Sequence, residues 1–290
     1  MNYVTTIVAQ RDAITLSPAL VNHIRNALHG APPVVLSAGE AVDIPLASPP
    51  RPEVLAAVLD GQPIDAITTK TRARRKALLI ADMDSTMIEG ETLDELAEYA
   101  GIGETIAAIT KRAMNGELDF KEALRERVGM LKGLKLDALE KTWERVRLTS
   151  GAQELVATMR ARGALTALVS GGFTFFTGRV AQQLGFDTHR GNVLHDDGSA
   201  LTGTVQQPIL DRDSKLVALH ELAATRGVKL NATLAVGDGA NDLAMIQAAG
   251  LGVAFHAKPV VAKEAKARVD HAGLRALLFA QGYPASVFVG

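Results

Sequence analysis

A continuous apolar run ends in two carboxylates in the stretch Ala77-Leu78-Leu79-Ile80-Ala81-Asp82-Met83-Asp84-Ser85-Thr86. The apolar part is too short for a helix, and its residues do not alternate with polar ones. A strand of a parallel sheet has this pattern, because helices cover both faces of such a sheet. We therefore predict a buried parallel strand over residues 77–81.

Two further apolar runs follow the same plan. Residues 165–169 precede Ser170-Gly171-Gly172, and residues 233–236 precede Gly237-Asp238-Gly239. Helix-like segments lie between the runs, for example over residues 152–162 and 215–226. This repeated order of strand, small-residue loop and helix predicts an open α/β sheet of Rossmann-like type. In such a sheet the functional site lies at the carboxyl ends of the strands.

The rest of the chain divides around this predicted core, which we assign to residues 77–90 and 150–290. Residues 91–149 are too long and too periodic for a loop, so we expect an inserted helical cap above the sheet. Residues 1–70 read as a small α+β unit. The basic run over residues 71–76 is interpreted as a solvated connector rather than a nucleic-acid patch. Residues 193–205 predict a hairpin whose Asp196-Asp197 pair forms a turn rather than a calcium loop.

Composition excludes several classes of protein. The 290 residues contain no cysteine, which rules out disulfides, thiolate metal sites and thiol nucleophiles. The 31 basic and 32 acidic residues leave no positive surplus, so a nucleic-acid partner is not expected. No apolar run approaches the length of about 18 residues that a membrane helix needs. We expect a cytoplasmic protein without a membrane partner.

The polar ends of the predicted strands carry the chemistry. Asp82, Asp84 and Asp238 would meet at one edge of the sheet, and such an all-oxygen set suits Mg²⁺. In extended backbone, Asp82 and Asp84 would face the same side. The Ser170 hydroxyl and the N–H groups that follow it could hold a phosphoryl oxygen, with Lys215 as a further positive charge. Taken singly, each of these motifs also fits a plain turn or a solvated side chain.

Together these motifs resemble, in the same order, those of the phosphoserine phosphatases of the haloacid dehalogenase-like (HAD) superfamily. The four matching segments are Asp82-Met83-Asp84-Ser85-Thr86, Ser170-Gly171-Gly172, Lys215 and Gly237-Asp238-Gly239-Ala240-Asn241-Asp242. Residues of the predicted cap resemble the phosphoserine-specific pattern of that family, namely Glu91, Met114, Phe120 and Arg127.

The resemblance implies an enzyme that hydrolyses O-phosphoserine to serine and phosphate with Mg²⁺, the last step of serine biosynthesis. Asp82 would be the nucleophile that forms an aspartyl-phosphate, and Asp84 the general acid and base. Mg²⁺ would bind Asp82, Asp238 and the backbone carbonyl of Asp84. The phosphate would be held by Ser170, Gly171 and Lys215, with Asn241 as support.

In the cap, the resemblance implies that Glu91 binds the substrate ammonium and that Arg127 binds its carboxylate. Met114 and Phe120 would supply apolar walls. The sequence leaves Arg125, Arg145 and Arg147 as competing carboxylate partners.

Two other functions stay open: a phosphatase for another small phosphorylated metabolite, or a regulatory amino-acid-binding protein with a residual phosphatase core. Residues 1–70 faintly resemble an ACT-like module, which suggests homodimer formation or feedback by serine.

Overall fold

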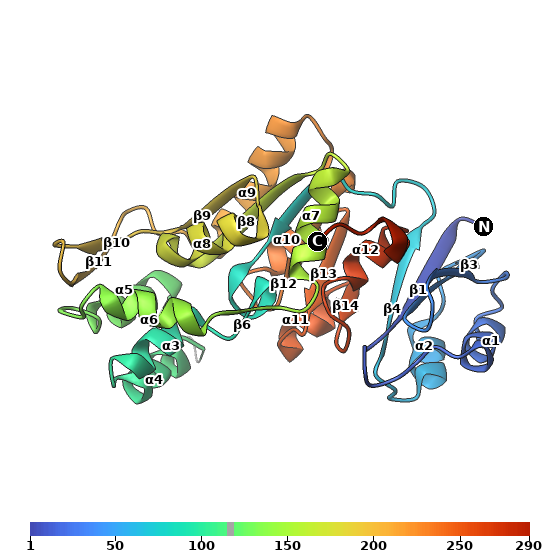
Figure 1. Ribbon diagram of the computed structural model, residues 1–290, viewed down its shortest axis with the longest axis horizontal. Helices are drawn as coiled ribbons and strands as arrows, with labels where there is room; N and C mark the ends of the chain where they lie inside the picture. The colour runs from blue at the N-terminus through green and yellow to red at the C-terminus, as the bar shows by residue number, and fades with distance from the viewer. Residues whose placement is uncertain (115–118) are drawn as a thin grey trace.

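The computed structural model describes residues 1–114 and 119–290, except for the side chains of Lys111, Ala113 and Met114. A central sheet flanked by helices lies between two smaller parts, with the N-terminal unit at one end and the cap helices at the other (Figure 1).

The core confirms the predicted parallel sheet. Its strand order is β14-β13-β12-β5-β8-β9, and every neighbouring pair is parallel. The strands are β5 (Leu78–Ala81), β8 (Leu165–Phe173), β9 (Thr188–Asn192), β12 (Thr233–Gly237), β13 (Leu251–Phe255) and β14 (Ala267–Val269). The helices are α7 (Ala152–Ala161), α8 (Thr174–Leu184), α9 (Arg212–Arg226), α10 (Leu243–Ala248), α11 (Pro259–Glu264) and α12 (Ala276–Ala280).

The strand β5 shows why an unbroken apolar run was needed. Leu79 and Ala81 pack on the face covered by α7, α8 and α12, whereas Leu78 and Ile80 pack on the face covered by α9 and α10. All four side chains are fully buried. Because successive side chains of a strand point to opposite faces, a sheet between two helical layers leaves no position for a polar residue.

The N-terminal unit is a four-stranded antiparallel sheet with the order β2-β3-β1-β4. Its elements are β1 (Tyr3–Ala9), α1 (Pro18–Ala27), β2 (Val34–Ser37), β3 (Ala41–Leu46), α2 (Pro52–Leu59) and β4 (Ile64–Lys70). This β-α-β-β-α-β order is the split βαβ, ferredoxin-like arrangement. The Ser17 hydroxyl accepts from Leu20 N–H and begins α1, as the sequence predicts for an N-cap followed by Pro18.

The two faces of this small sheet have different neighbours. Ile7 and Ile44 pack against α1 and α2, which cover one face. Val8, Leu36 and Ile67 belong instead to the cluster that contains α12 of the core. The N-terminal unit is therefore packed on the core through the face that its own helices leave open.

Arg74, in the connector between the two parts, corrects a prediction. The basic run was expected to be solvated, but the Arg74 side chain is only 13% exposed. Its guanidinium donates to both Asp43 carboxylate oxygens, at 2.6 and 3.0 Å, and to the carbonyls of Phe279 and Ala280. The Thr6 hydroxyl also donates to Asp43, at 2.7 Å. The connector thus ties β1 and β3 to α12.

Asp65 of β4 makes a second tie. Its carboxylate accepts from the backbone N–H groups of Asp270, His271 and Ala272 at 2.7, 3.1 and 2.7 Å. These three residues follow β14, the edge strand of the core sheet. A buried carboxylate needs such donors because they replace the hydrogen bonds that it made to water in the unfolded chain.

Between β5 and α7 the chain forms the helical cap. It contains α3 (Thr92–Tyr99), α4 (Gly103–Met114), α5 (Phe120–Gly129) and α6 (Asp137–Arg145). A short antiparallel ribbon of β6 (Ile88–Glu89) and β7 (Arg147–Leu148) brings both ends of the cap together at the core. Asp119 begins α5 with a capping box that includes Glu122.

The predicted hairpin is confirmed as β10 (Leu194–Asp196) and β11 (Leu201–Val205). The Asp197 carboxylate accepts from the N–H groups of Ser199 and Ala200, which accounts for it as a turn residue. The hairpin lies beside the cap, where Gly133 N–H donates to the Leu201 carbonyl at 2.8 Å.

Candidate active site

The segment after β5 carries the first two carboxylates of the site. Asp82 and Asp84 both have extended φ and ψ angles, and residues Met83–Met87 form one wide turn in which Ser85 is left-handed at φ 53°. The extended backbone that was predicted for the two aspartates is therefore present at both of them, and the chain turns at Ser85. The turn is closed by the Ile88 N–H, which donates to the Met83 carbonyl. A non-glycine residue with positive φ is strained, a condition that is concentrated at functional sites.

Asp82 and Asp242 share one buried lysine. Lys215 lies in the first turns of α9 and is 2% exposed. Its Nζ lies 2.7 Å from Asp82 Oδ1 and 2.5 Å from Asp242 Oδ1. Burial alone would lower the pKa of Lys215, but the charges of Asp242 and Asp82 outweigh it and raise the pKa above its ordinary value. Lys215 therefore remains charged and holds both aspartates.

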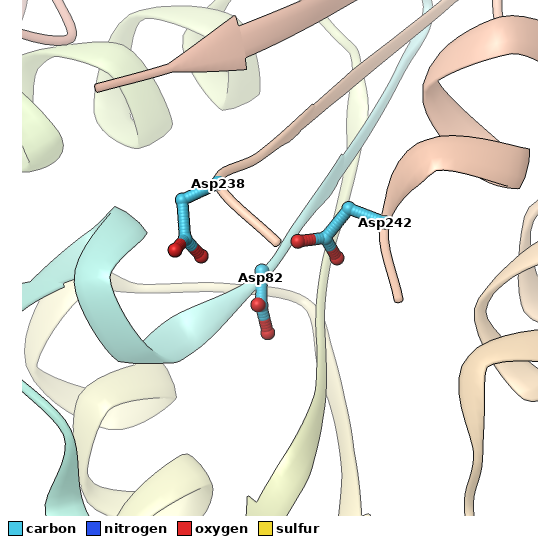
Figure 2. A group of neighbouring side chains, drawn as sticks. All are labelled: Asp82, Asp238 and Asp242. Carbon is cyan, nitrogen blue, oxygen red and sulfur yellow. The ribbon is translucent and has the colours of Figure 1, made fainter. Parts of the chain in front are cut away.

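Three aspartates gather at the mouth of the sheet. Asp82, Asp238 and Asp242 each offer a carboxylate oxygen, and these oxygens lie within 4.8 Å of one another. Figure 2 shows the three side chains approaching from the ends of β5 and β12 and from the start of α10. Burial, together with the charge of Asp82, raises the pKa of Asp238 to about 6. The site thus holds more negative charge than its neighbours neutralise.

Asp84 differs from Asp82 in its surroundings. Burial is the main cause that raises its pKa to about 7, and the charge of Glu91 adds to this effect. The Thr92 N–H donates to Asp84 Oδ1 at 2.9 Å, and the Ser170 hydroxyl lies 3.5 Å from Oδ2. A carboxyl group with a pKa near neutral pH, as at Asp84, is suited to give and take a proton.

Residues Ser170–Gly172 lie in an irregular part of β8, close to Asp84, and we name them the phosphate loop after their predicted role. A Cβ on Gly172 would lie 2.8 Å from Asp84 Oδ2, so only glycine fits there. A Cβ on Gly171 would lie 3.2 Å from Cζ of Phe120. The first residue of α5 therefore covers the phosphate loop and brings the cap over the predicted site.

Glu91 and Arg127 are the charged cap residues that were predicted to bind the substrate. The carboxylates of Asp94 and Glu91 favour the protonated Arg127, although burial lowers its pKa. Arg127 is half-buried, whereas the competing Arg125, Arg145 and Arg147 are exposed. Glu91 accepts from the Ser85 hydroxyl at 2.8 Å. Of these four arginines, Arg127 is thus the half-buried one, and its charge is within range of the carboxylates of Asp94 and Glu91.

The predicted residue Met114 lies outside the described residues, since its side chain is not described. Asn241 is half-buried beside Gly239, in the loop that carries Asp238.

Sequence reasoning did not single out Thr92, Ser85 or Lys258. Lys258 Nζ lies 3.7 Å from Asp238 Oδ2, and its side chain is 53% exposed. Ser85 carried a signal because it lies inside the first motif, and Thr92 because it follows Glu91 in the cap pattern.

Comparison with known proteins gives a consistent result. The family model of the haloacid dehalogenase-like hydrolases matches residues 79–247. A phosphoserine phosphatase of Streptococcus thermophilus is 46% identical over 199 residues, which are 69% of this chain and 93% of that protein. A phosphoserine phosphatase of Archaeoglobus fulgidus is 44% identical over 212 residues, 73% of this chain, and the match spans only 62% of its length.

A solved structure extends the likeness to the whole chain. A HAD-family hydrolase from Salmonella enterica serovar Typhi has a TM-score of 0.86 and 28% sequence identity, and the match covers 96% of this chain and 97% of that one. This likeness includes the N-terminal unit as well as the core and the cap. Separately, among residues 1–114 and 119–290 no helix is both long enough and apolar enough to cross a membrane.

Proposed function

Because the chain belongs to the haloacid dehalogenase-like hydrolases and, within them, to the phosphoserine phosphatases, we propose that it hydrolyses O-phospho-L-serine to L-serine and inorganic phosphate with Mg²⁺. The observation that carries the reaction is the pair Asp82 and Asp84. Asp82 is held by Lys215, and Asp84 lies beside it with a pKa of about 7. In a cell, this reaction would complete serine biosynthesis.

Asp82 acts as the nucleophile. One of its carboxylate oxygens forms a bond to phosphorus while the bond between phosphorus and the serine oxygen breaks, which gives an aspartyl-phosphate and a serine alkoxide. Asp84, protonated near neutral pH, gives its proton to that oxygen. The ionised Asp84 then takes a proton from water, whose oxygen attacks phosphorus and releases phosphate from Asp82.

The phosphoryl oxygens bind to groups that are already in place. The Ser170 hydroxyl, the N–H groups of the phosphate loop and Lys215 surround the mouth of β5 and β8. Their hydrogen bonds and charge stabilise the oxygens as negative charge develops on them. Asp242 accepts from Lys215 and from Gly239 N–H, and so orients the lysine.

The donor set fits Mg²⁺. Among the described residues, Asp82, Asp84, Asp238 and Asp242 share the site with the buried Lys215 and the half-exposed Lys258, so negative charge is in excess. Asp82, Asp238 and the backbone carbonyl of Asp84 would hold the ion through oxygen atoms, which it prefers. When bound, Mg²⁺ would neutralise charge on the carboxylates and on the phosphoryl group.

Substrate choice rests on the cap. Phosphoserine carries an ammonium and a carboxylate beyond its phosphate, and the cap offers Glu91 for the first and Arg127 for the second. Arg127 can bind a carboxylate with two parallel hydrogen bonds. Phe120 lies against the phosphate loop and would exclude water when substrate is bound.

A panel of phosphomonoesters tests the proposal. In Mg²⁺ buffer, O-phosphoserine should have the highest kcat/KM among O-phosphothreonine, glycerol phosphate and phenyl phosphate. A better result for another ester would instead indicate a phosphatase for a different metabolite. Asp82→Asn should abolish phosphate release; unchanged release would contradict the mechanism.

Arg127→Ala tests the carboxylate contact. Because loss of a charged hydrogen-bonding pair costs about 1.5–3 kcal/mol, KM for O-phosphoserine should rise at least tenfold, whereas phenyl phosphate should be affected little. Arg125→Ala, an exposed arginine two positions away on α5, is the matched control and should change neither constant.

The role of residues 1–70 stays a prediction. If this unit supports a homodimer or feedback by serine, light scattering and assays with added serine will detect it in the full chain. The face of its sheet that packs on α12 is already used within the chain.

A further inference from the structure

Asn192, the last residue of β9, lies behind the phosphate loop and is 3% exposed. The pairing between β8 and β9 is irregular at this point. Val169 pairs with Arg190 and Phe173 pairs with Asn192, so four residues of β8 advance against two of β9. The two additional residues lie in the phosphate loop, which therefore bulges out of the sheet.

The Asn192 side chain holds this bulge from behind. Its Nδ2 donates to the Gly171 carbonyl at 2.8 Å. A buried carbonyl that has left the regular ladder needs another donor, and the Asn192 amide supplies it. The bond fixes Gly171, the central residue of the phosphate loop, and the next residue, Gly172, donates its N–H to the Ser170 hydroxyl at 2.9 Å.

The same amide also holds the segment that leads into α9. Leu210 N–H donates to Asn192 Oδ1 at 2.8 Å, and Asn192 Nδ2 lies 3.4 Å from the Leu210 carbonyl. The next residue, Asp211, is the N-cap of α9 and accepts from Ser214 N–H. Lys215 follows directly, so Asn192 is connected to the start of the helix that carries the phosphate-binding lysine.

We propose that Asn192 is a positioning residue that sets the phosphate loop and Lys215 at the separation that a phosphoryl group requires. It does not contact the substrate and acts through Gly171 and Leu210. Its roles require an amide, because one end must donate to a carbonyl while the other accepts from an N–H. The proposal rests on the proposed phosphatase function and adds to it a residue outside the four motifs.

Asn192→Asp is the sharpest variant. Aspartate has nearly the same shape and keeps an acceptor for Leu210 N–H, but it places an oxygen against the Gly171 carbonyl. The dissociation constant for inorganic phosphate, measured by calorimetry in Mg²⁺ buffer, should rise about ten- to hundredfold. kcat for O-phosphoserine should fall, since a misplacement of about 1 Å can cost about a hundredfold in rate. Asn22→Asp, the same change at an exposed position of α1, is the matched control and should change neither value.

Asn192→Ala, which removes both contacts without adding charge, keeps the proposal falsifiable if the aspartate variant does not fold. Each variant is measured well below its own unfolding temperature. A folded variant that binds phosphate within twofold of the unchanged chain and keeps its kcat would overturn the proposal, even if its unfolding temperature is lower. Phosphate binding does not depend on which ester is the substrate. Failure of the unchanged chain to bind phosphate or hydrolyse any ester would instead overturn the proposed function.

Discussion

At the contact between the N-terminal unit and the core, each buried aspartate has a cation or N–H donors of its own. Beneath the cap, the buried aspartates outnumber the cations that neutralise them. Asp43 faces the Arg74 guanidinium, and Asp65 accepts three backbone N–H groups. Asp82 and Asp242 share a single lysine, and the pKa values of Asp84 and Asp238 are raised to about 7 and about 6. The same residue type thus stabilises one region and leaves the other ready for a cation and a phosphate.

The N-terminal unit and the cap also differ in the polar contacts that attach them to the core. The N-terminal unit is joined to the core by buried polar contacts and a shared apolar cluster. The cap belongs to the same apolar cluster, through residues such as Leu96, Leu124 and Val128. Its polar contacts with the core are a ribbon of two short strands and surface ion pairs, such as Arg179 with Glu140. The two attachments therefore differ in their polar contacts, which are buried at the N-terminal unit and exposed at the cap.

The largest expected effect comes from Arg74→Ala. This change leaves Asp43 buried without its cation, and removal of one partner of a buried pair costs about 3–5 kcal/mol. Urea unfolding should show this loss, while kcat at a temperature where the variant is folded should be nearly unchanged. Arg72→Ala, at an exposed position of the same connector, should cost less than about 0.5 kcal/mol. Equal losses for the two variants would remove the distinction between the regions.

Mg²⁺ should stabilise the folded chain by binding the aspartates beneath the cap, and the aspartates at the interface with the N-terminal unit should not contribute to this effect. At a concentration 100 times its dissociation constant, a ligand that binds only the folded state stabilises it by about 2.7 kcal/mol. Thermal unfolding with and without Mg²⁺ measures this gain. Asp238→Asn should reduce it strongly, whereas Asp65→Asn should lower stability but preserve the gain. Loss of the gain in Asp65→Asn would place the ion elsewhere.

The pH dependence of stability should separate the two sets of aspartates further. Because the folded-state pKa of Asp84 is raised from 3.8 to about 7, the folded chain binds an extra proton between these values. Its contribution to the free energy of unfolding therefore falls as pH rises from about 4 to 7. Asp84→Asn removes this fall, so without Mg²⁺ the variant should be more stable than the unchanged chain at pH 8, by about 1–3 kcal/mol.

Urea unfolding at pH 4 and pH 8 tests that expectation, and the difference between the two proteins should shrink at pH 4. Asp43→Asn is the comparison from the interface. It should destabilise the chain at pH 8, because Arg74 loses its anion. A destabilising Asp84→Asn at pH 8 would show that Asp84 is already neutralised in the folded chain.

The smallest effect is expected at the edge of the cap. Glu140→Ala removes a two-bond ion pair between α6 and Arg179 of α8, at 2.6 Å for each bond. Surface pairs of this kind contribute about 0.2–1 kcal/mol. Glu144→Ala, on an exposed part of the same helix, is the control for unfolding measurements. A cost above that of Arg74→Ala would mean that the cap is the more firmly attached part.

Much of the fold and of the site could be predicted because local patterns carry it. The unbroken apolar run before Asp82 predicts a strand buried on both faces, and small residues after each strand predict the site edge. What could not be predicted depends on distant partners. Arg74 was predicted to be solvated because its hydrogen-bond partners are distant in the sequence, the furthest of them 206 positions away. Asn192 gave no signal, since nothing in its neighbours reveals the bulge that it supports.

The open face of the N-terminal sheet has a consequence for biosynthesis. Val8 and Leu36 are covered by the cluster that includes α12, and Arg74 binds the Ala280 carbonyl 206 positions further along the chain. At a synthesis rate of about 5–20 residues per second, that apolar face waits about 10–40 s for its cover. During this interval the growing chain has a sheet with one exposed apolar face. Completion of the N-terminal unit is thus one of the last events in the maturation of the molecule, although its residues are made first.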